Sequence, residues 1–388
     1  MIITIDGNIP SYYAHSFNVM KMAQGFRDSG QEVELVSQLS WQGIKIRRKV
    51  GNLRDFYGVS DDFKITLLPV YNRQFFTHPI RARGYFEKAS DYIKKKNPEF
   101  VFSRGFITFY NCVKNQIPSI VETHRTDYDH PFMKMLIEVK DHPYFAGLVT
   151  IHENIKKEYV KRGIPEDKIL VLEDGVDTSL YQENPDKRAL REELGLPQEK
   201  TIALYSGGLY KEKGIELIIK TAALFANDDL LFVLVGGNED QVQHWKKIGD
   251  EYGCKNIRFM GFQANKNVPR FLQAADILLM PYDLEMNYKV MDINSTSPLK
   301  LFEYMSSGTP IISTDIQVIN KIVRHKQQAW LVNPDDREMG IKAAIIELKD
   351  HKTVGHTMAQ SALKEVQQYT WKHRCETIIN ELVQPYYQ

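Results

Sequence analysis

The sequence predicts an α/β protein made of two doubly wound domains, each built on a parallel sheet. Its 388 residues are more than a single domain with one hydrophobic core usually contains, so two domains of about 150 to 200 residues are expected. Short apolar runs alternate with segments of helical spacing, which is the pattern of βαβ units. The alternation stops at a polar, turn-rich stretch near 180–200 and then begins again, so each half predicts a domain of its own.

The first half contains apolar runs of strand length bounded by turn residues. These predicted strands are Ile2–Ile5, Val33–Val36, Ile65–Pro69, Phe100–Ser103, Ile120–Glu122 and Gly147–Ile151. Between them, His15–Arg27 and Arg83–Lys95 have the apolar spacing of helices. In the second half the predicted strands are Ile202–Tyr205, Leu231–Val235, Ile257–Phe259, Ile277–Met280 and Pro310–Ser313. The predicted domains are therefore residues 1–185 and 186–368.

The composition excludes several classes of protein. With 43% hydrophobic and 26% charged residues, the chain has the composition of a globular protein and not of a disordered or fibrous one. Its 50 basic and 49 acidic residues leave a net charge of +1, far from the balance of a general nucleic-acid binder. Cys112, Cys254 and Cys375 form neither a CxxC pair nor a disulfide framework. Neither a leader peptide nor a membrane span is visible, so we expect a cytoplasmic protein.

Ligands of open parallel sheets bind at the loops after the carboxyl ends of the strands. One such loop, Gly207–Gly214, follows the first predicted strand of the second half. Gly207 and Gly208 allow close approach of a ligand to the backbone, and Lys213 supplies a cation, which together favour a phosphate. The alternative is a tight strand-to-helix turn with a solvated lysine. Neither GxGxxG nor GxxxxGK[ST] occurs, which disfavours a nicotinamide enzyme or a P-loop protein.

A second loop leads into a helix whose ends are marked in the sequence. Ser297 suits the N-cap, Pro298 the first helical position and Gly308 the end. The free N–H groups over 298–300 and the positive end of the helix dipole favour an anion there, and Lys300 adds charge. A lysine in the first turn opposes the dipole, so a bound diphosphate explains it better than a tolerated surface lysine does.

Glu303 follows Lys300 by one turn on the same face of this predicted helix. Its carboxylate either accepts hydrogen bonds from a ribose diol beyond the phosphate or forms an intrahelical pair with Lys300.

These loops resemble family 4 of the glycosyltransferases, whose members have the GT-B fold of two Rossmann-like domains facing a cleft. The resemblance rests on the strings SPLKLFEYMSSGTPII, GGLYKEKG, LEDGVD and AADILLMP, and it is strongest over residues 165–320. It implies a retaining enzyme that takes its sugar from a nucleoside diphosphate held by the C-terminal domain, with no cofactor and no divalent metal. It also implies that a helix within 369–388 returns to the N-terminal domain.

The resemblance implies catalytic roles for His124, Lys213 and Glu303. Lys213 would contact the donor diphosphate, and Glu303 would bind the ribose as the second glutamate of an E-x7-E motif. The implied donor-binding residues are Gly207, Gly208, Lys213, Gly261, Phe262, Ser295, Ser297, Pro298, Leu299, Lys300, Leu301 and Glu303.

Two positions depart from the pattern of the family. Ser295 stands where the first glutamate of the motif belongs, and Gly208 stands where an arginine is usual. The phosphate charge must then be met by Lys213, Lys300 and the helix N-terminus, with Arg104 as a further candidate.

The N-terminal half is expected to face the acceptor. The segment 121–124 resembles the strand of the family that ends in a histidine near the reacting sugar, although His124 taken alone is more often a structural histidine at a strand end. The residues expected on the acceptor side are Tyr13, His15, Arg104 and Glu122.

The implied function is transfer of a hexose-type sugar, with retention, from a nucleoside diphosphate sugar to a saccharide acceptor in cell-surface glycan synthesis. UDP is favoured over GDP as the nucleotide. The leaving diphosphate would take the acceptor proton, so we assign no nucleophile. Because a glutamate and an arginine are missing, a nucleotide-sugar-binding pseudoenzyme stays open, as does a GT-B nucleotide-sugar epimerase.

Residues 41–100 hold 13 lysines and arginines against 6 acidic residues. The basic residues include Lys45, Arg47, Arg48, Lys49, Arg73, Arg81 and Arg83, interleaved with Trp41, Phe75, Phe76, Tyr85 and Phe86. Such a mixture suits the anionic inner face of the cell membrane, at about 1 kcal/mol per basic residue, and a lipid-linked acceptor. The alternative is a solvated face above core aromatic residues.

Overall fold

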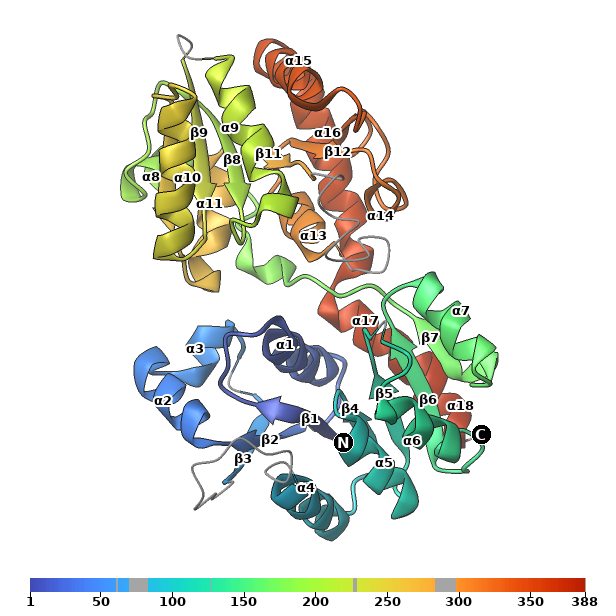
Figure 1. Cartoon of the computed structure of the whole chain (residues 1–388). Coiled ribbons are helices and arrows are strands. Elements are labelled where there is room, and N and C mark those ends of the chain that lie inside the picture. The colour runs from blue at the N-terminus through green and yellow to red at the C-terminus, as the bar shows by residue number, and fades with distance from the viewer. Residues whose placement is uncertain (61, 70–82, 126, 226–228, 283–297, 388) are drawn as a thin grey trace. The chain divides into compact units, whose positions relative to one another are not determined.

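The computed structural model describes residues 1–387 apart from 61, 70–82, 126, 226–228 and 283–297 (Figure 1). The chain forms two compact units. Residues 1–175 and the segment from Trp371 onward make the first, and Val176–Thr370 makes the second.

The first unit contains a seven-stranded parallel sheet in the order β3-β2-β1-β4-β5-β6-β7. Its strands are β1 Ile2–Asn8, β2 Glu34–Leu39, β3 Lys64–Pro69, β4 Val101–Ser103, β5 Ser119–Glu122, β6 Phe145–Thr150 and β7 Ile169–Val171. Its helices are α1 Ala14–Asp28, α2 Trp41–Val50, α3 Leu53–Tyr57, α4 Arg83–Lys96, α5 Phe106–Lys114, α6 Pro131–Val139, α7 Glu153–Lys161, η2 Glu166–Lys168, α17 Trp371–Ile378, η8 Ile379–Val383 and α18 Gln384–Tyr387.

The second unit contains a six-stranded parallel sheet in the order β10-β9-β8-β11-β12-β13. Its strands are β8 Thr201–Ser206, β9 Leu230–Val235, β10 Ile257–Gly261, β11 Ile277–Met280, β12 Ile311–Thr314 and β13 Trp330–Val332. Its helices are α8 Lys187–Glu193, α9 Ile215–Ala223, α10 Glu239–Glu251, α11 Val268–Ala274, α13 Leu299–Ser306, α14 Gln317–Asn320, α15 Arg337–Asp350 and α16 Lys352–Glu365, with short turns η3 Thr178–Leu180, η4 Lys211–Lys213, η5 Asn265–Asn267 and η7 Val366–Tyr369.

Helices cover both faces of the second sheet, as Figure 1 shows. Successive side chains of a strand point to opposite faces. In β8, Ile202 and Leu204 therefore pack against α8, α11 and α13, whereas Ala203 and Tyr205 pack against α9 and α15. All six residues of β9 are buried, which is why this strand is a continuous apolar run in the sequence.

The predicted α/β class and the two doubly wound parallel sheets are confirmed. Each apolar run that predicts a strand overlaps a strand. The sequence analysis missed β7 and β13, although Ile169–Val171 and Trp330–Val332 are short apolar runs as long as β4, which was predicted. Both lie at the edge of a sheet.

The helix predicted from Pro298 begins one residue later. Pro298 has φ −85° and ψ 59°, which is not helical, so it occupies the N-cap position and α13 starts at Leu299. The carbonyl of Pro298 accepts the first bond of the helix from the N–H of Leu301 at 2.8 Å. Ser297, the expected N-cap, lies outside the described residues.

The units change over at 175/176 and 370/371, whereas the sequence analysis placed these boundaries at 185/186 and 368/369. The difference has a local cause. The N–H of Val176 donates to the carbonyl of Tyr369 at 2.8 Å, and Val176 packs into the core of the second unit with Tyr181 against it. Residues 176–185 therefore lie with the second unit.

The surface proposed for residues 41–100 is smaller than the composition indicates. Tyr85 and Phe86 belong to the core, because α4 packs them against Leu68 and Ile107. Trp41 is 66% exposed on α2. Arg73, Phe75, Phe76 and Arg81 lie outside the described residues.

No described helix combines the length and the apolar character that crossing a bilayer requires.

The C-terminal helix α17 packs against α1 within the first unit. Gly25 of α1 makes this approach possible, because a Cβ at this position would lie 2.7 Å from the carbonyl oxygen of Trp371 and 2.8 Å from Sγ of Cys375. The N-terminal unit thus depends on a segment that follows the second unit in the chain.

We expect Gly25→Ala to lower the free energy of unfolding by about 1 to 3 kcal/mol, because overpacking at the α1–α17 contact outweighs the higher helix propensity of alanine. Gly84→Ala is the matched control, since Gly84 is also helical and nothing lies within 4 Å of its Cβ position. Thermal unfolding of both variants measures the difference. Equal melting temperatures would contradict this packing.

Candidate functional site

The carboxyl ends of the parallel strands of the second unit meet at one edge of its sheet. Gly207 follows β8 there, and its φ of +139° lies in the region that favours glycine. A Cβ at Gly207 would lie 2.8 Å from Nζ of Lys300. The missing side chain therefore makes the space that the ammonium group of Lys300 occupies.

Two lysines, Lys213 and Lys300, form what we call the lysine pair. Nζ of Lys300 lies 3.7 Å from the centre of the Tyr205 ring, and Nζ of Lys213 lies 5.1 Å from the centre of the Tyr282 ring. Both are cation–π contacts, which attract an ammonium group without neutralising its charge. Within the described residues, neither ammonium group forms an ion pair with a carboxylate.

Burial lowers the pKa of both lysines. For Lys300 the pKa falls well below its ordinary value, first because of burial and then because of the charge of Lys213, while Glu303 acts in the opposite direction. For Lys213 burial is the main cause, and Glu212 opposes it. Two cations at close range in a low-dielectric site favour a bound anion, because an anion restores the charged form of both.

Tyrosine hydroxyl groups fix the loop below the pair. The hydroxyl of Tyr205 donates to the carbonyl of Gly208 at 2.9 Å, and the hydroxyl of Tyr304 accepts from the N–H of Ser206 at 2.8 Å. Tyr205 and Tyr304 are fully buried, so the Tyr205 ring cannot move away from Lys300 without opening the core.

The start of α13 lies beside the pair, since Lys300 is in its first turn. The N–H groups of Leu299 and Lys300 precede the first helical bond and are placed to donate to an anion. Leu301 differs, because its side chain is buried and its N–H already donates to Pro298.

Glu303 is half-buried one turn further along α13. The pKa of Tyr181 is raised well above its ordinary value, first by burial of Tyr181 and then by the negative charge of Glu303. The Glu303 carboxylate and the Tyr181 phenol are therefore close. At the end of β10, Gly261 has φ +64° and Phe262 is 70% exposed. An exposed aromatic ring at this edge of the sheet offers a flat surface for stacking.

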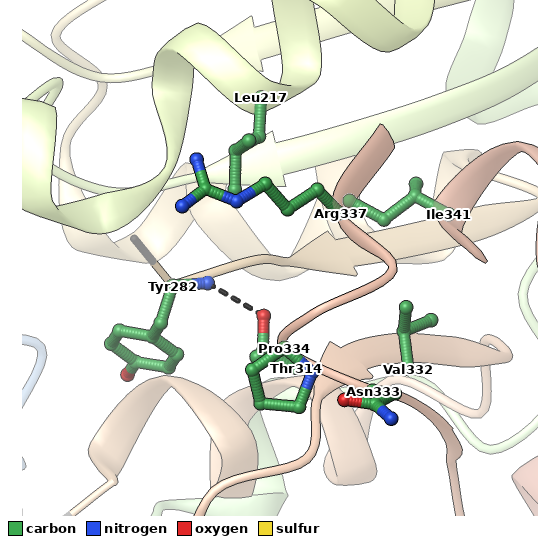
Figure 2. A pocket seen from close by; sticks show the side chains of 8 residues that line it. All are labelled: Leu217, Tyr282, Thr314, Val332, Asn333, Pro334, Arg337 and Ile341. Carbon is green, nitrogen blue, oxygen red and sulfur yellow. Dashed lines mark hydrogen bonds between the residues drawn. The ribbon is translucent and has the colours of Figure 1, made fainter. Parts of the chain in front are cut away.

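A pocket at the same edge is lined by Leu217, Tyr282, Thr314, Val332, Asn333, Pro334, Arg337 and Ile341 (Figure 2). The N–H of Tyr282 donates to Oγ1 of Thr314 at 2.9 Å. Arg337 has φ +29°, a strained value for a residue with a side chain, and Figure 2 shows its side chain extending toward Leu217. Tyr282 connects this pocket with the lysine pair.

A second group of polar side chains lies at the carboxyl edge of the first sheet. We call it the Glu122 cluster; it consists of Asn18, Arg104, Glu122, His124, Asp174 and Arg374. Oε1 of Glu122 lies 2.7 Å from Nε2 of His124, 2.8 Å from Nη2 of Arg374 and 3.4 Å from Nη1 of Arg104. Burial alone would raise the pKa of Glu122, but Arg374, Arg104 and the bond from His124 hold it well below its ordinary value.

Glu122, His124 and Asp174 have ligand atoms within 4.8 Å of one another, a spacing that suits a metal ion. However, Glu122 already accepts from Arg374 and Arg104. A divalent cation would have to share the carboxylate with two guanidinium groups, so the donor set does not fit a metal.

Tyr13 and His15 lie near this cluster at the start of α1. Their rings stack with centres 5.6 Å apart, and Tyr13 is 66% exposed. Burial and the charge of Arg104 lower the pKa of His15. The loop therefore presents aromatic surface beside a cationic group.

The structure thus brings Gly207, Gly208, Lys213 and Lys300 together in the second unit, and Arg104, Glu122 and His124 together in the first. Ser295 and Ser297 lie outside the described residues. The sequence analysis missed Tyr205, Tyr282, Arg337, Asp174 and Arg374 as site residues. Tyr282 and Asp174 follow the ends of strands β11 and β7, and this position is the feature that could have predicted them.

Comparison with sequence families gives two matches that together span most of the chain. Residues 18–180 match the family described as Glycosyltransferase Family 4, and residues 186–365 match the family described as Glycosyl transferases group 1. The chain belongs to the glycosyltransferases.

Individual relatives of this glycosyltransferase are distant. An uncharacterized glycosyltransferase of Methanocaldococcus jannaschii is 20% identical over 242 residues, 60% of this chain and 58% of that protein. The alpha-galactosylglucosyldiacylglycerol synthase of Streptococcus pneumoniae is 23% identical over 231 residues, 58% of each chain. The chain thus spans little more than half the length of these curated relatives.

Among solved structures, Anabaena HepE in complex with UDP and glucose matches with a TM-score of 0.71 and 14% identity over 99% of both chains. At this identity the likeness shows the fold, which is the GT-B fold.

We expect Gly207→Ala to destabilise the second unit by about 2 to 4 kcal/mol, because it adds a contact with Nζ of Lys300 to backbone strain. Gly253→Ala is the control, since Gly253 has φ +69° with nothing within 4 Å and should lose only about 1 kcal/mol. Lys300→Ala should rescue part of the loss in the double variant. Strictly additive effects in urea unfolding would show that the two residues are not in contact.

Proposed function

We propose that this glycosyltransferase moves a hexose-type sugar from a nucleoside diphosphate sugar to a saccharide acceptor. The observation that carries the proposal is the lysine pair. Its two half-buried ammonium groups contact tyrosine rings, and that of Lys300 also occupies the space beside Gly207. No described carboxylate pairs with either lysine. A diphosphate supplies the charge that this arrangement lacks. UDP is the proposed nucleotide, and the HepE complexes with UDP and UDP-glucose support it.

In this proposal the donor lies along the carboxyl edge of the second sheet. Lys213, Lys300 and the N–H groups at the start of α13 bind the diphosphate, and Glu303 accepts from the ribose. Phe262 stacks against the base. The two ammonium groups supply positive charge at the phosphates, so we propose that transfer needs neither a divalent metal nor another cofactor.

We propose that the sugar is transferred with retention, through attack from the face on which the diphosphate leaves. The leaving oxygen takes the acceptor proton, and Lys213 and Lys300 stabilise the negative charge that develops on it. The chain then contributes positioning and electrostatics and not a nucleophile.

Lys213→Met and Lys300→Met should each weaken the binding of a UDP-sugar by about 10- to 100-fold, because each removes one charge-assisted contact while keeping the apolar stem. Lys211→Met is the control, since Lys211 lies in the same turn and its Nζ is 3.8 Å from Glu216. Saturation-transfer NMR followed by titration measures the affinities. Equal binding by all three variants would refute the diphosphate site.

The same samples separate transfer from its alternatives. Because Ser295 and Gly208 replace two residues of the family pattern, binding without turnover would identify a pseudoenzyme. Slow hydrolysis of the bound donor, with release of the free sugar, supports a transferase. Release of the epimeric sugar would identify an epimerase.

We also propose that the acceptor is lipid-linked and that α2 contacts an anionic membrane at the inner face of the cell membrane. The exposed side of α2 carries Lys45, Arg47, Arg48 and Lys49, and Nζ of Lys45 lies 5.9 Å from the ring of the exposed Trp41. An aromatic residue beside several cations is the arrangement that binds anionic headgroups. The relative that is named an alpha-galactosylglucosyldiacylglycerol synthase supports a lipid-linked acceptor.

Replacing Arg47, Arg48 and Lys49 by glutamine should weaken binding to vesicles with anionic lipid by about 3 kcal/mol, on the order of 100-fold. The control replaces Lys94, Lys95 and Lys96, three exposed lysines in the last turn of α4. Vesicle sedimentation reports both affinities. If the two triple variants bind alike, α2 is not the contact surface.

A further inference from the structure

The Glu122 cluster contains an interaction that the proposed function does not use. Arg374 comes from α17, 252 residues after Glu122 in the sequence, and its guanidinium is buried. It donates to Oε1 of Glu122 at 2.8 Å and to the carbonyl of Leu172 at 2.9 Å. The terminal helix thus adds a cation to the edge of a sheet that is otherwise built from the first 175 residues.

Glu122 in turn fixes the protonation of His124. Nε2 of His124 lies 2.7 Å from Oε1 of Glu122 and 3.2 Å from Nη1 of Arg104. A carboxylate can only accept and a guanidinium can only donate, so the two neighbours demand opposite states of Nε2. The shorter bond, to a carboxylate held ionised by Arg374, requires a proton on Nε2.

A neutral imidazole carries one proton. If that proton is on Nε2, the lone pair of Nδ1 remains to accept a hydrogen bond. Within the part of the chain that the structure describes, no partner of His124 Nδ1 is found, and the His124 side chain is 21% exposed. Nδ1 is therefore the atom of this ring that can meet a ligand.

We propose that Arg374 is a positioning residue: it keeps Glu122 ionised, and Glu122 orients His124 with its proton on Nε2 and its Nδ1 lone pair available to a sugar hydroxyl. The identity of that hydroxyl as part of a saccharide rests on the proposed function. The protonation of His124 does not, since it follows from the cluster alone.

The charges around His124 can be counted. Among the described residues, the groups that face it are Glu122 at the end of β5, Arg104 after β4, Asp174 after β7 and Arg374 on α17, with the neutral Asn18 of α1 bonded to Asp174. Two cations and two carboxylates balance when His124 is neutral. Changing either Glu122 or Arg374 disturbs this balance, and the two changes have opposite signs.

The experiment uses the full-length protein with ¹⁵N-labelled histidine, and His124→Gln identifies the signals of residue 124. In the wild type, alkaline buffer should show His124 with its proton on Nε2. Arg374→Met leaves an excess negative charge and should increase the fraction of His124 that is doubly protonated at neutral pH. Glu122→Gln leaves an excess positive charge and should decrease that fraction.

Arg374→Lys keeps the charge and is the conservative control, which should restore the wild-type spectrum. A merely structural role of Arg374 would move the His124 signals of both charge variants in the same direction or not at all, and either result would overturn the proposal. A proton on Nδ1 in the wild type would overturn it as well. If Arg374→Met does not fold, the wild-type tautomer and Glu122→Gln still decide the question.

Binding of a UDP-sugar by the same variants separates this proposal from the proposed function. The lysine pair belongs to the second unit, so donor affinity should stay within a few fold of the wild type in the Arg374 and Glu122 variants. Loss of the predicted histidine shifts with intact donor binding would refute only the role of Arg374. Intact histidine shifts without donor binding by the wild type would refute only the proposed function.

Discussion

The chemistry of the second unit depends on one electrostatic constraint. The ammonium groups of Lys213 and Lys300 pack against tyrosine rings, and no described carboxylate pairs with them. Burial lowers the pKa of both, and for Lys300 the charge of Lys213 adds to the effect. A desolvated cation with no described counter-ion destabilises a fold, so a bound anion would recover that free energy. Gly207 and the buried hydroxyl groups of Tyr205 and Tyr304 hold this geometry in place.

The fold could be predicted from the sequence because central strands such as β8, β9 and β11 are buried on both faces. β9 is apolar at every position, and turn residues bound such runs in both halves. The same rule placed the candidate loops, since ligands of parallel sheets bind at the carboxyl edge. The rule did not predict the starting residue of α13, because that residue depends on the backbone angles of Pro298.

The contacts that define the chemistry of each site could not be predicted from the sequence, for a different reason. Tyr282 and Lys213 are far apart in the chain, as are Arg374 and Glu122, and no local periodicity records such contacts. His124 could be singled out only by resemblance, and its protonation depends on neighbours from four other elements. The composition of residues 41–100 could not separate surface from core aromatic residues, and Tyr85 and Phe86 are core residues.

The most direct test of the lysine pair is calorimetry of UDP-glucose binding in buffers that differ in their enthalpy of ionisation. The donor has no group that titrates between neutral pH and about pH 8, so any proton exchanged in this range belongs to the protein. The pKa values of the two lysines are lowered in the protein alone, and we expect a bound diphosphate to raise them again. The account therefore predicts that binding takes up protons and that affinity falls as the pH rises over this range. Binding without proton uptake, or no binding of any nucleotide sugar, would contradict it.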